Sequence, residues 1–103
     1  MRESEFQRSV KDRLRLLFPG CIVTKLDSGD IQGIPDLQIL YGCDWATLET
    51  KKNKDASKQA NQEYYVNRMN DMAFSRFIYP ENVNHVLREL GDYFQEQERK
   101  RSK

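Results

Sequence analysis

Histidine and cysteine are scarce in this sequence, which has one histidine and two cysteines among 103 residues. The cysteines are not spaced as Cys-x-x-Cys, so neither a thiolate zinc site nor a disulfide framework is indicated. We expect Cys21 and Cys43 to be small buried residues. The single histidine, His85, lies far in sequence from the acidic motifs described below, which is typical of a structural or surface residue.

Long apolar runs and glycine-rich loops are also missing. No run is long enough to span a bilayer, and the N-terminus lacks the pattern of a signal peptide. The absence of a phosphate-cradling glycine loop excludes a P-loop nucleotide site. We therefore expect a protein without membrane segments in a reducing compartment, the cytoplasm.

Charge of one sign is not in excess, because 17 Lys and Arg residues against 16 Asp and Glu residues give a net charge of +1. Net charge alone therefore does not indicate a nucleic-acid partner, although the basic residues are clustered. One cluster lies mid-chain, and the other is a basic C-terminal tail at about residues 96–103. The mid-chain cluster consists of Lys51, Lys52, Lys54 and Lys58.

Size and composition indicate one globular domain over residues 1–103. Hydrophobic residues make up 38% and aromatic residues 11% of the chain, which excludes a disordered protein. A domain this small buries only about 60 to 65% of the surface that its unfolded chain exposes, so self-association would stabilise it. We place the core at about residues 3–90.

Apolar periodicity predicts one helix and three strands in the first half. Residues 3–18 carry a helical stripe that ends at Pro19-Gly20. Short apolar and β-branched runs at residues 21–26, 36–41 and 45–51 predict three strands in a meander. The apolar stripe of the helix is Phe6, Val10, Leu14 and Leu17.

The second half predicts a helix, a strand and a further helix. Ser57 is predicted to cap a helix that runs to about Met72, with Tyr65, Met69 and Met72 facing inward. A strand at residues 74–79 ends at Pro80, where the third helix follows. The inward stripe of that helix is Val83, Val86, Leu87, Leu90 and Phe94.

The order α-β-β-β-α-β-α predicts an α/β fold with a central mixed sheet flanked by helices. Each helix has one apolar stripe and must bury it against the sheet. The third strand, the second helix and the fourth strand would form a βαβ unit, in which the two strands are parallel.

Two acidic motifs lie on neighbouring predicted strands. Gly33-Ile34-Pro35-Asp36 opens one strand, and Glu49-Thr50-Lys51 ends the next, thirteen residues after the aspartate. Side chains alternate across a strand, so Glu49 and Lys51 share a face while Thr50 points to the other. The motifs therefore predict that two acids and a lysine meet at one edge of the sheet.

Such a group of residues suits a hard divalent metal. Two carboxylates, of Asp36 and Glu49, and the backbone carbonyl of Thr50 would bind Mg²⁺ or Mn²⁺ better than zinc. Lys51 would orient a water molecule for attack on a phosphodiester. The alternative is an exposed ion pair of Glu49 and Lys51, with Asp36 as a turn residue.

Helical phase adds two candidates. Glu3 lies within the apolar stripe of the first helix and is a possible further acid, whereas Glu5 lies on the opposite side. For Glu3 the alternative is a favourable acid at a helix N-terminus. Gln62 faces the packed side of the second helix, and Gln59, one turn earlier, competes with it for a site role.

Further polar residues surround these motifs in the sequence and are candidates for phosphate contacts. Such contacts give affinity and salt dependence without reading base sequence. An ordinary solvated surface is the alternative. The candidates are Lys25, Ser28, Lys52, Lys54 and Lys58.

With Pro35-Asp36, Glu49-Thr50-Lys51 and this element order, the chain resembles the PD-(D/E)XK nuclease superfamily, which has a restriction-endonuclease-like core. Within it, residues 3 to 90 most resemble the small virus-type replication-repair nuclease (VRR-NUC) domains in the stand-alone form that phages encode. The resemblance implies that Asp36 and Glu49 are metal ligands and Lys51 the catalytic lysine. It also implies that Glu3 is a further acid and Gln62 the helical motif glutamine. Thr50 departs from the pattern, because such domains often have an aliphatic residue there.

The resemblance further implies DNA cleavage with magnesium or manganese by a homodimer that acts on branched DNA such as Holliday junctions. The leading hypothesis is therefore a structure-selective DNA endonuclease, located in the host cytoplasm if a phage encodes it. The first alternative is a non-catalytic nucleic-acid-binding module with a nuclease-like fold. The second is a small interaction protein that pairs through its third helix.

Overall fold

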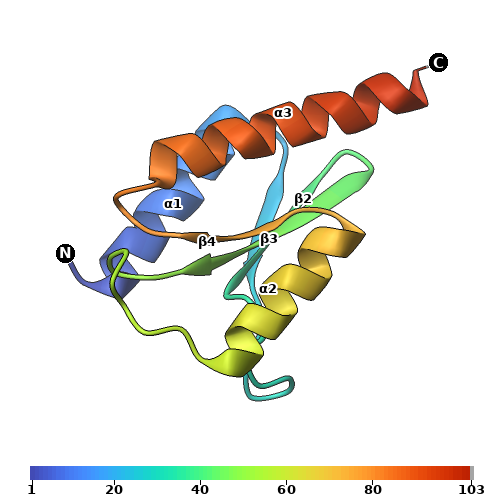
Figure 1. Ribbon diagram of the computed structural model, residues 1–103. Helices are drawn as coiled ribbons and strands as arrows, with labels where there is room; N and C mark the ends of the chain where they lie inside the picture. The colour runs from blue at the N-terminus through green and yellow to red at the C-terminus, as the bar shows by residue number, and fades with distance from the viewer. Residues whose placement is uncertain (103) are drawn as a thin grey trace.

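The computed structural model describes residues 1–102 and consists of a four-stranded sheet packed between helices (Figure 1). The order of the elements is α-β-β-β-α-β-α, which confirms the predicted order and fold class. In chain order they are α1 (Glu3–Leu17), β1 (Ile22–Lys25), β2 (Leu37–Tyr41), β3 (Asp44–Thr50), α2 (Ala60–Met72), β4 (Ser75–Ile78) and α3 (Val83–Arg101).

The sheet is mixed and its strands lie in the order β1-β2-β3-β4. β1 pairs with β2 and β2 with β3 in antiparallel register, whereas β3 and β4 are parallel. This arrangement confirms both the meander and the βαβ unit, since the parallel pair requires a crossover and α2 provides it. The crossover brings the start of α2 back to the end of β3 (Figure 1).

The two faces of β3 contact different helices. Ala46 and Leu48 are fully buried in the main core, which α1 and α3 share with the sheet. On the other face, Thr47 contacts α2, where its Oγ1 lies 3.4 Å from Met69 Sδ. Residues that alternate at the end of β3 therefore point toward α1 on one face and α2 on the other. The core contributions of α1 and α3 are Phe6, Val10, Leu14, Val86, Leu87, Leu90 and Phe94.

At the C-terminus of α1, Phe18 takes the place predicted for Leu17. Leu17 is 51% exposed, whereas Phe18 is 7% exposed. The reason is that the helix ends at Leu17, and Phe18 leaves helical geometry at φ −126° and ψ 75°. Its ring then packs against Tyr41 and Phe94, with ring centroids 5.4 and 5.2 Å away.

The second helix is shorter and packs differently from the prediction. Its N-cap is Gln59 rather than Ser57, because residues 51–59 form turns, bends and irregular backbone before the first helical turn. Val66 is its buried residue, whereas Met72 is 60% exposed. Met72 was predicted to face inward, but it lies at the last residue of the helix, where the chain turns toward β4.

One cysteine prediction is wrong. Cys43 is exposed, because it lies in the tight turn between β2 and β3, where Gly42 has φ +62°. Cys21 is partly buried, and its Sγ lies 3.7 Å from the carbonyl oxygen of Leu14. His85 is a surface residue, as expected.

The basic segment near the C-terminus is helical as far as Arg101. The Arg101 guanidinium forms two hydrogen bonds, of 2.7 and 2.8 Å, with the Asp44 carboxylate in the turn region of the sheet. This bidentate contact attaches the last turn of α3 to the β2–β3 hairpin. None of the helices in residues 1–102 has the length and apolar character needed to cross a membrane.

Candidate active site

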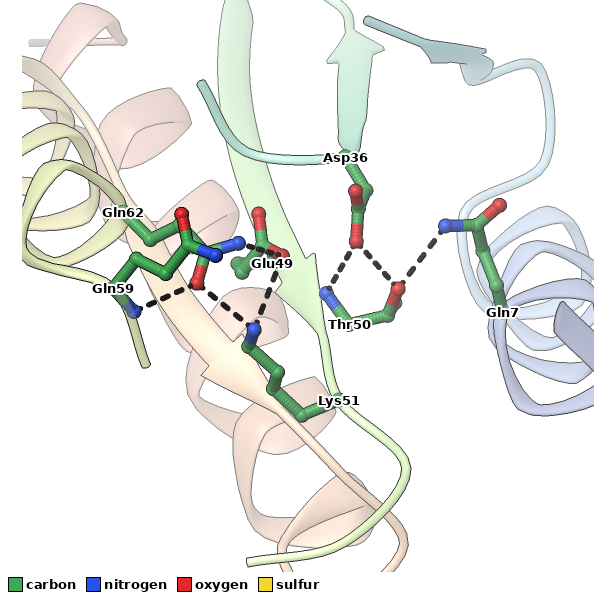
Figure 2. A network of polar contacts seen from close by, with 7 residues as sticks. All are labelled: Gln7, Asp36, Glu49, Thr50, Lys51, Gln59 and Gln62. Atoms are coloured by element: carbon green, nitrogen blue, oxygen red, sulfur yellow. Dashed lines mark hydrogen bonds and ion pairs between the residues drawn. The ribbon is translucent and has the colours of Figure 1, made fainter. Parts of the chain in front are cut away.

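The candidate site lies where β3 ends, next to the start of β2 and the start of α2. Glu49 and Lys51 are 4% and 8% exposed, so they do not form the surface ion pair of the alternative interpretation. Asp36 precedes Leu37, whose partner in β3 is Leu48, and this register places Asp36 beside Glu49. The meander therefore brings the two acidic motifs together as predicted (Figure 2).

Asp36 replaces the missing backbone partner at the end of the β2–β3 ladder. Its Oδ2 accepts hydrogen bonds from the Thr50 backbone N–H at 3.0 Å and from Thr50 Oγ1 at 2.7 Å. Thr50 Oγ1 in turn accepts a hydrogen bond of 3.0 Å from Gln7 Nε2 on α1. Asp36 is thereby fixed from the α1 side of the sheet (Figure 2).

Gln62 organises the opposite side. Lys51 Nζ donates to Gln62 Oε1 at 2.9 Å, and Gln62 Nε2 donates to Glu49 Oε2 at 3.4 Å. The ammonium of Lys51 lies 4.0 Å from Glu49 Oε2. Gln59 donates its backbone N–H to Gln62 Oε1 and caps α2, so of the two glutamines it is Gln62 whose side chain reaches Lys51 and Glu49 (Figure 2).

The electrostatic state of Glu49 is unusual. Burial has the largest effect and the negative charge of Asp36 the next, and together they raise the pKa of Glu49 to about 8. Lys51 lowers that pKa by less, and Glu3 adds a small increase. Without a bound cation, the Glu49 carboxyl therefore keeps its proton to a higher pH than an exposed glutamate does.

The glycine before Asp36 is required by close packing against α2. Gly33 has φ +91°, and a Cβ at this position would lie 2.7 Å from Cγ and 2.9 Å from the backbone carbonyl carbon of Asn61. Asn61 Nδ2 also donates to the Gln32 carbonyl at 3.2 Å. Gly33 therefore lets the loop that leads to Asp36 lie directly on the start of α2.

Two surface hollows lie beside the buried residues Glu49 and Lys51. One, of about 450 Å³, includes Asp36, Glu49 and Gln62, and the loop residue Ser28 lines it as well. The other, of about 510 Å³, includes Lys51 and the exposed side chain of Glu3. Two separate hollows thus adjoin the residues of the site.

Glu3 lies at the edge of the site and not in its centre. Its side chain is exposed in the first turn of α1, close enough to raise the pKa of Glu49 slightly. In residues 1–102 no group of three or more His, Cys, Asp and Glu side chains is close enough to hold a metal ion. The acidic centre therefore consists of two carboxylates, Asp36 and Glu49.

This donor set fits magnesium. Mg²⁺ in proteins commonly takes one or two carboxylates and keeps several water molecules, so a third acidic ligand is not required. A cation between the buried Glu49 carboxylate and the partly buried Asp36 carboxylate would also offset the burial and the repulsion that raise the pKa of Glu49. The backbone carbonyl of Thr50 remains a predicted ligand.

The predicted phosphate contacts divide into three groups. Ser28 and Lys52 line the hollows beside the site, one on each side. Lys25 and Lys54 are exposed at the end of β1 and in the loop after β3. Lys58 is also exposed, but its ammonium lies over the Phe77 ring, 4.8 Å from the centroid, so this cation is already engaged with the sheet.

Sequence reasoning assigned no role to the side chains of Gln7 and Thr50. Helical phase could have indicated Gln7, which lies one turn after Glu3 and beside Phe6 on the buried side of α1. Strand alternation placed Thr50 on the face opposite Glu49 and Lys51, but nothing in the sequence indicated that its hydroxyl would bind Asp36. A hydrogen bond between side chains 43 residues apart depends on tertiary packing.

Comparison with known proteins gives matches at the level of structure. No protein-family model matches the chain, and no curated protein matches it. A solved structure described as "VRR_NUC domain" superposes with a TM-score of 0.69 and 22% identity over 84% of this chain and 94% of that one. The chain has the VRR_NUC fold.

A second solved structure, described as "VRR_NUC domain protein", has a TM-score of 0.65 and 14% identity. It matches 92% of this chain and 89% of its own length, so the VRR_NUC fold accounts for nearly the whole chain. These matches confirm the likeness to VRR_NUC domains and the α/β fold that were inferred from the sequence. At such low identity the likeness establishes the VRR_NUC fold, and the activity is argued from the site.

Proposed function

We propose that this chain is a metal-dependent DNA endonuclease that hydrolyses phosphodiester bonds. The observation that supports it best is the convergence of Asp36, Glu49 and Lys51 at the end of β3, with Glu49 and Lys51 buried. Buried charged residues are costly unless they are paired or bind a metal. Their occurrence in the VRR_NUC fold favours a nuclease over a purely structural ion pair.

In this proposal Asp36, Glu49 and the Thr50 carbonyl would hold Mg²⁺, with Mn²⁺ as a substitute. The bound ion would supply a Lewis acid beside the scissile phosphate and neutralise the charge that develops there. Glu3 would act from the edge of the site, on water molecules around the ion.

Lys51 is the group that meets the substrate. Gln62 holds its ammonium 4.0 Å from the Glu49 carboxylate, at the boundary of the two hollows. A fixed ammonium there would orient the attacking water and stabilise the negative charge on the phosphate oxygens. Because Gln62 uses its amide oxygen on Lys51 and its amide nitrogen on Glu49, we assign it to positioning these two groups.

The proposed substrate is branched DNA, and the proposed active form is a homodimer. The VRR_NUC fold accounts for nearly all of the described residues, so residues 1–102 contain no second unit that would read base sequence, which favours recognition of DNA shape. A four-way junction has two-fold symmetry, so a two-fold dimer would place one site on each of two opposed strands. Lys25, Ser28, Lys52 and Lys54 would contact the phosphates on either side of the site.

Cleavage of a panel of DNAs tests the activity and the substrate together. Wild type should cleave a four-way junction or a flap with Mg²⁺ or Mn²⁺ and should leave linear duplex largely intact. Asp36→Asn and Lys51→Met should each lower the rate by 100-fold or more, as loss of a group that acts in the transition state does. Lys100→Met, which removes an exposed lysine of α3 outside the proposed site, is the matched control and should keep most of the activity.

The second candidate function is a non-catalytic nucleic-acid-binding module. The observation that favours it is the pair of carboxylates where a fuller acidic cluster would hold metal more firmly. Strong DNA binding in EDTA, with no cleavage in any divalent metal, would establish this function instead. Equal residual cleavage by wild type and Lys51→Met would likewise reject the catalytic proposal.

A further inference from the structure

A chain of hydrogen bonds that begins on α1 holds the Asp36 carboxylate. Gln7 Nε2 donates to Thr50 Oγ1, and Thr50 then donates to Asp36 Oδ2 through both its hydroxyl and its backbone N–H. We propose that the Gln7 amide and the Thr50 hydroxyl are positioning residues, which fix Asp36 Oδ2 and thereby present Oδ1 to the metal ion. This inference rests on the proposed function, to which it adds two residues and a reason for the orientation of Asp36.

The chemistry of the three side chains determines which group donates and which accepts in each hydrogen bond. The NH₂ group of Gln7 only donates, so Thr50 Oγ1 accepts from Gln7 and its own hydrogen is directed to Asp36. Both Thr50 donors end on Oδ2, so Oδ1 is not engaged by Thr50. An ionised carboxylate held through one oxygen offers the other as a ligand in a fixed direction.

The hydrogen bonds of Thr50 are protected from water by burial. Thr50 is fully buried, so its hydroxyl cannot exchange Asp36 for water. Hydrogen bonds in such surroundings are stronger than in water, and partners of ligating carboxylates typically change metal affinity 10- to 100-fold when they are removed. The hydroxyl of Thr50 is therefore predicted to affect metal binding, beyond its contribution to packing.

The test measures the affinity of the metal-free protein for Mn²⁺ by calorimetric titration. Thr50→Val keeps the shape and the backbone N–H but removes the hydroxyl, and it should weaken Mn²⁺ binding about tenfold or more. Thr50→Ser restores the hydroxyl and should bind within about twofold of wild type, since packing changes alone do not alter the ligand. The same ranking is expected for the Mg²⁺ concentration that gives half-maximal cleavage.

Thr47→Val is the matched control. Thr47 lies on the same strand, is equally buried, and donates its hydroxyl to Ser75 Oγ at 2.7 Å, away from Asp36. Loss of the Thr47 hydroxyl in Thr47→Val should lower the thermal stability of the protein without changing its affinity for Mn²⁺. If Thr50→Val and Thr47→Val both lower stability and both bind Mn²⁺ like wild type, the hydroxyl is structural and the inference is wrong.

Gln7→Met tests the hydrogen bond from α1 and avoids a change at the fully buried Thr50. It should weaken Mn²⁺ binding by a few-fold, and the Gln7→Met/Thr50→Val double variant should bind no worse than Thr50→Val, because Gln7 acts through the hydroxyl. Additive losses, or no loss for Gln7→Met, would overturn its assigned role.

The outcomes separate this inference from the proposed function. If Mn²⁺ affinity depends on the Thr50 hydroxyl but wild type cleaves no DNA, the inference stands and the nuclease proposal fails. If wild type cleaves DNA and Thr50→Val binds Mn²⁺ as tightly as wild type, the nuclease proposal stands and this inference fails. A wild type that binds no Mn²⁺ defeats both.

Discussion

At Glu49, burial and a neighbouring carboxylate both favour the protonated form of the side chain. The pKa rises to about 8 from the ordinary value of 4.5. Asp36 causes part of this increase and also lies beside the proposed metal position, so proton and metal compete for the same group. A single residue thus connects the pH dependence of folding with that of metal binding.

Without metal, we expect the stability of the folded protein to decrease as the pH rises. Between about pH 4.5 and 8 folded Glu49 keeps a proton that the unfolded chain has lost, so the free energy of unfolding falls as pH rises. The full effect is on the order of 4 kcal/mol. Urea unfolding in EDTA from pH 5 to 9 should show this loss for wild type, and Glu49→Gln should show a much flatter curve.

Glu63→Gln is the control for this experiment, because Glu63 is an exposed acid of α2. Its curve should run parallel to that of wild type. Adding Mg²⁺ at pH 8 should raise the stability of wild type and of Glu63→Gln, but not that of Glu49→Gln, because a bound cation offsets the repulsion between the carboxylates. Parallel pH curves for wild type and Glu49→Gln would show that the proton is not held there.

At the scale of the elements, the loop before β2 and the start of α2 form one packed unit. Gly33 fits against Asn61 because it has no side chain, and the chain reaches Asp36 three residues later. The position of the aspartate therefore depends on a contact between a loop and a helix that are distant in sequence. Disturbing that contact should change both stability and catalysis.

The second prediction compares two glycines. Gly33 and Gly42 both have positive φ, at +91° and +62°, but only Gly33 has neighbours where a Cβ would be. Gly42→Ala should cost about 1 to 2 kcal/mol from backbone strain alone. Gly33→Ala should cost more, since the clash includes backbone of Asn61, and it should also slow cleavage. Urea unfolding and single-turnover rates measure the two effects, and equal losses for both variants would contradict the role of this contact.

The sequence was sufficient to predict the element order, because each helix has an apolar stripe and each strand is a short run bounded by turn residues or by a helix, with β-branched residues most frequent in β1. The sequence also predicted that Asp36, Glu49 and Lys51 lie close together, since side chains alternate between the two faces of a strand and the two motifs lie on adjacent strands. The sequence placed Met72 inward wrongly, because the last turn of α2 is exposed, whereas Met69 does reach Thr47 on the sheet as predicted. The Gln7–Thr50–Asp36 chain depends on how α1 lies across the sheet, which periodicity does not specify.

For the whole molecule, the distribution of charge matters more than its sum. The net charge is only +1, so the chain has little long-range attraction for DNA. Affinity in the proposed function must then come from cations close to the site. Lys52 and Lys54 are the exposed candidates that are nearest in sequence to Lys51.

The third prediction is the salt dependence of DNA binding by the intact protein in Ca²⁺ or EDTA, where cleavage is prevented. Each lysine that neutralises a phosphate contributes about 0.9 to the slope of log affinity against log salt. Lys52→Gln/Lys54→Gln should therefore lower the slope by nearly 2 and weaken binding to all DNAs alike. Arg88→Gln/Lys100→Gln changes the net charge equally on exposed positions of α3, far along the chain from the site, and should leave the slope nearly unchanged. Equal changes in slope for the two double variants would mean that DNA responds to overall charge, and that the phosphates are not held beside the β3 site.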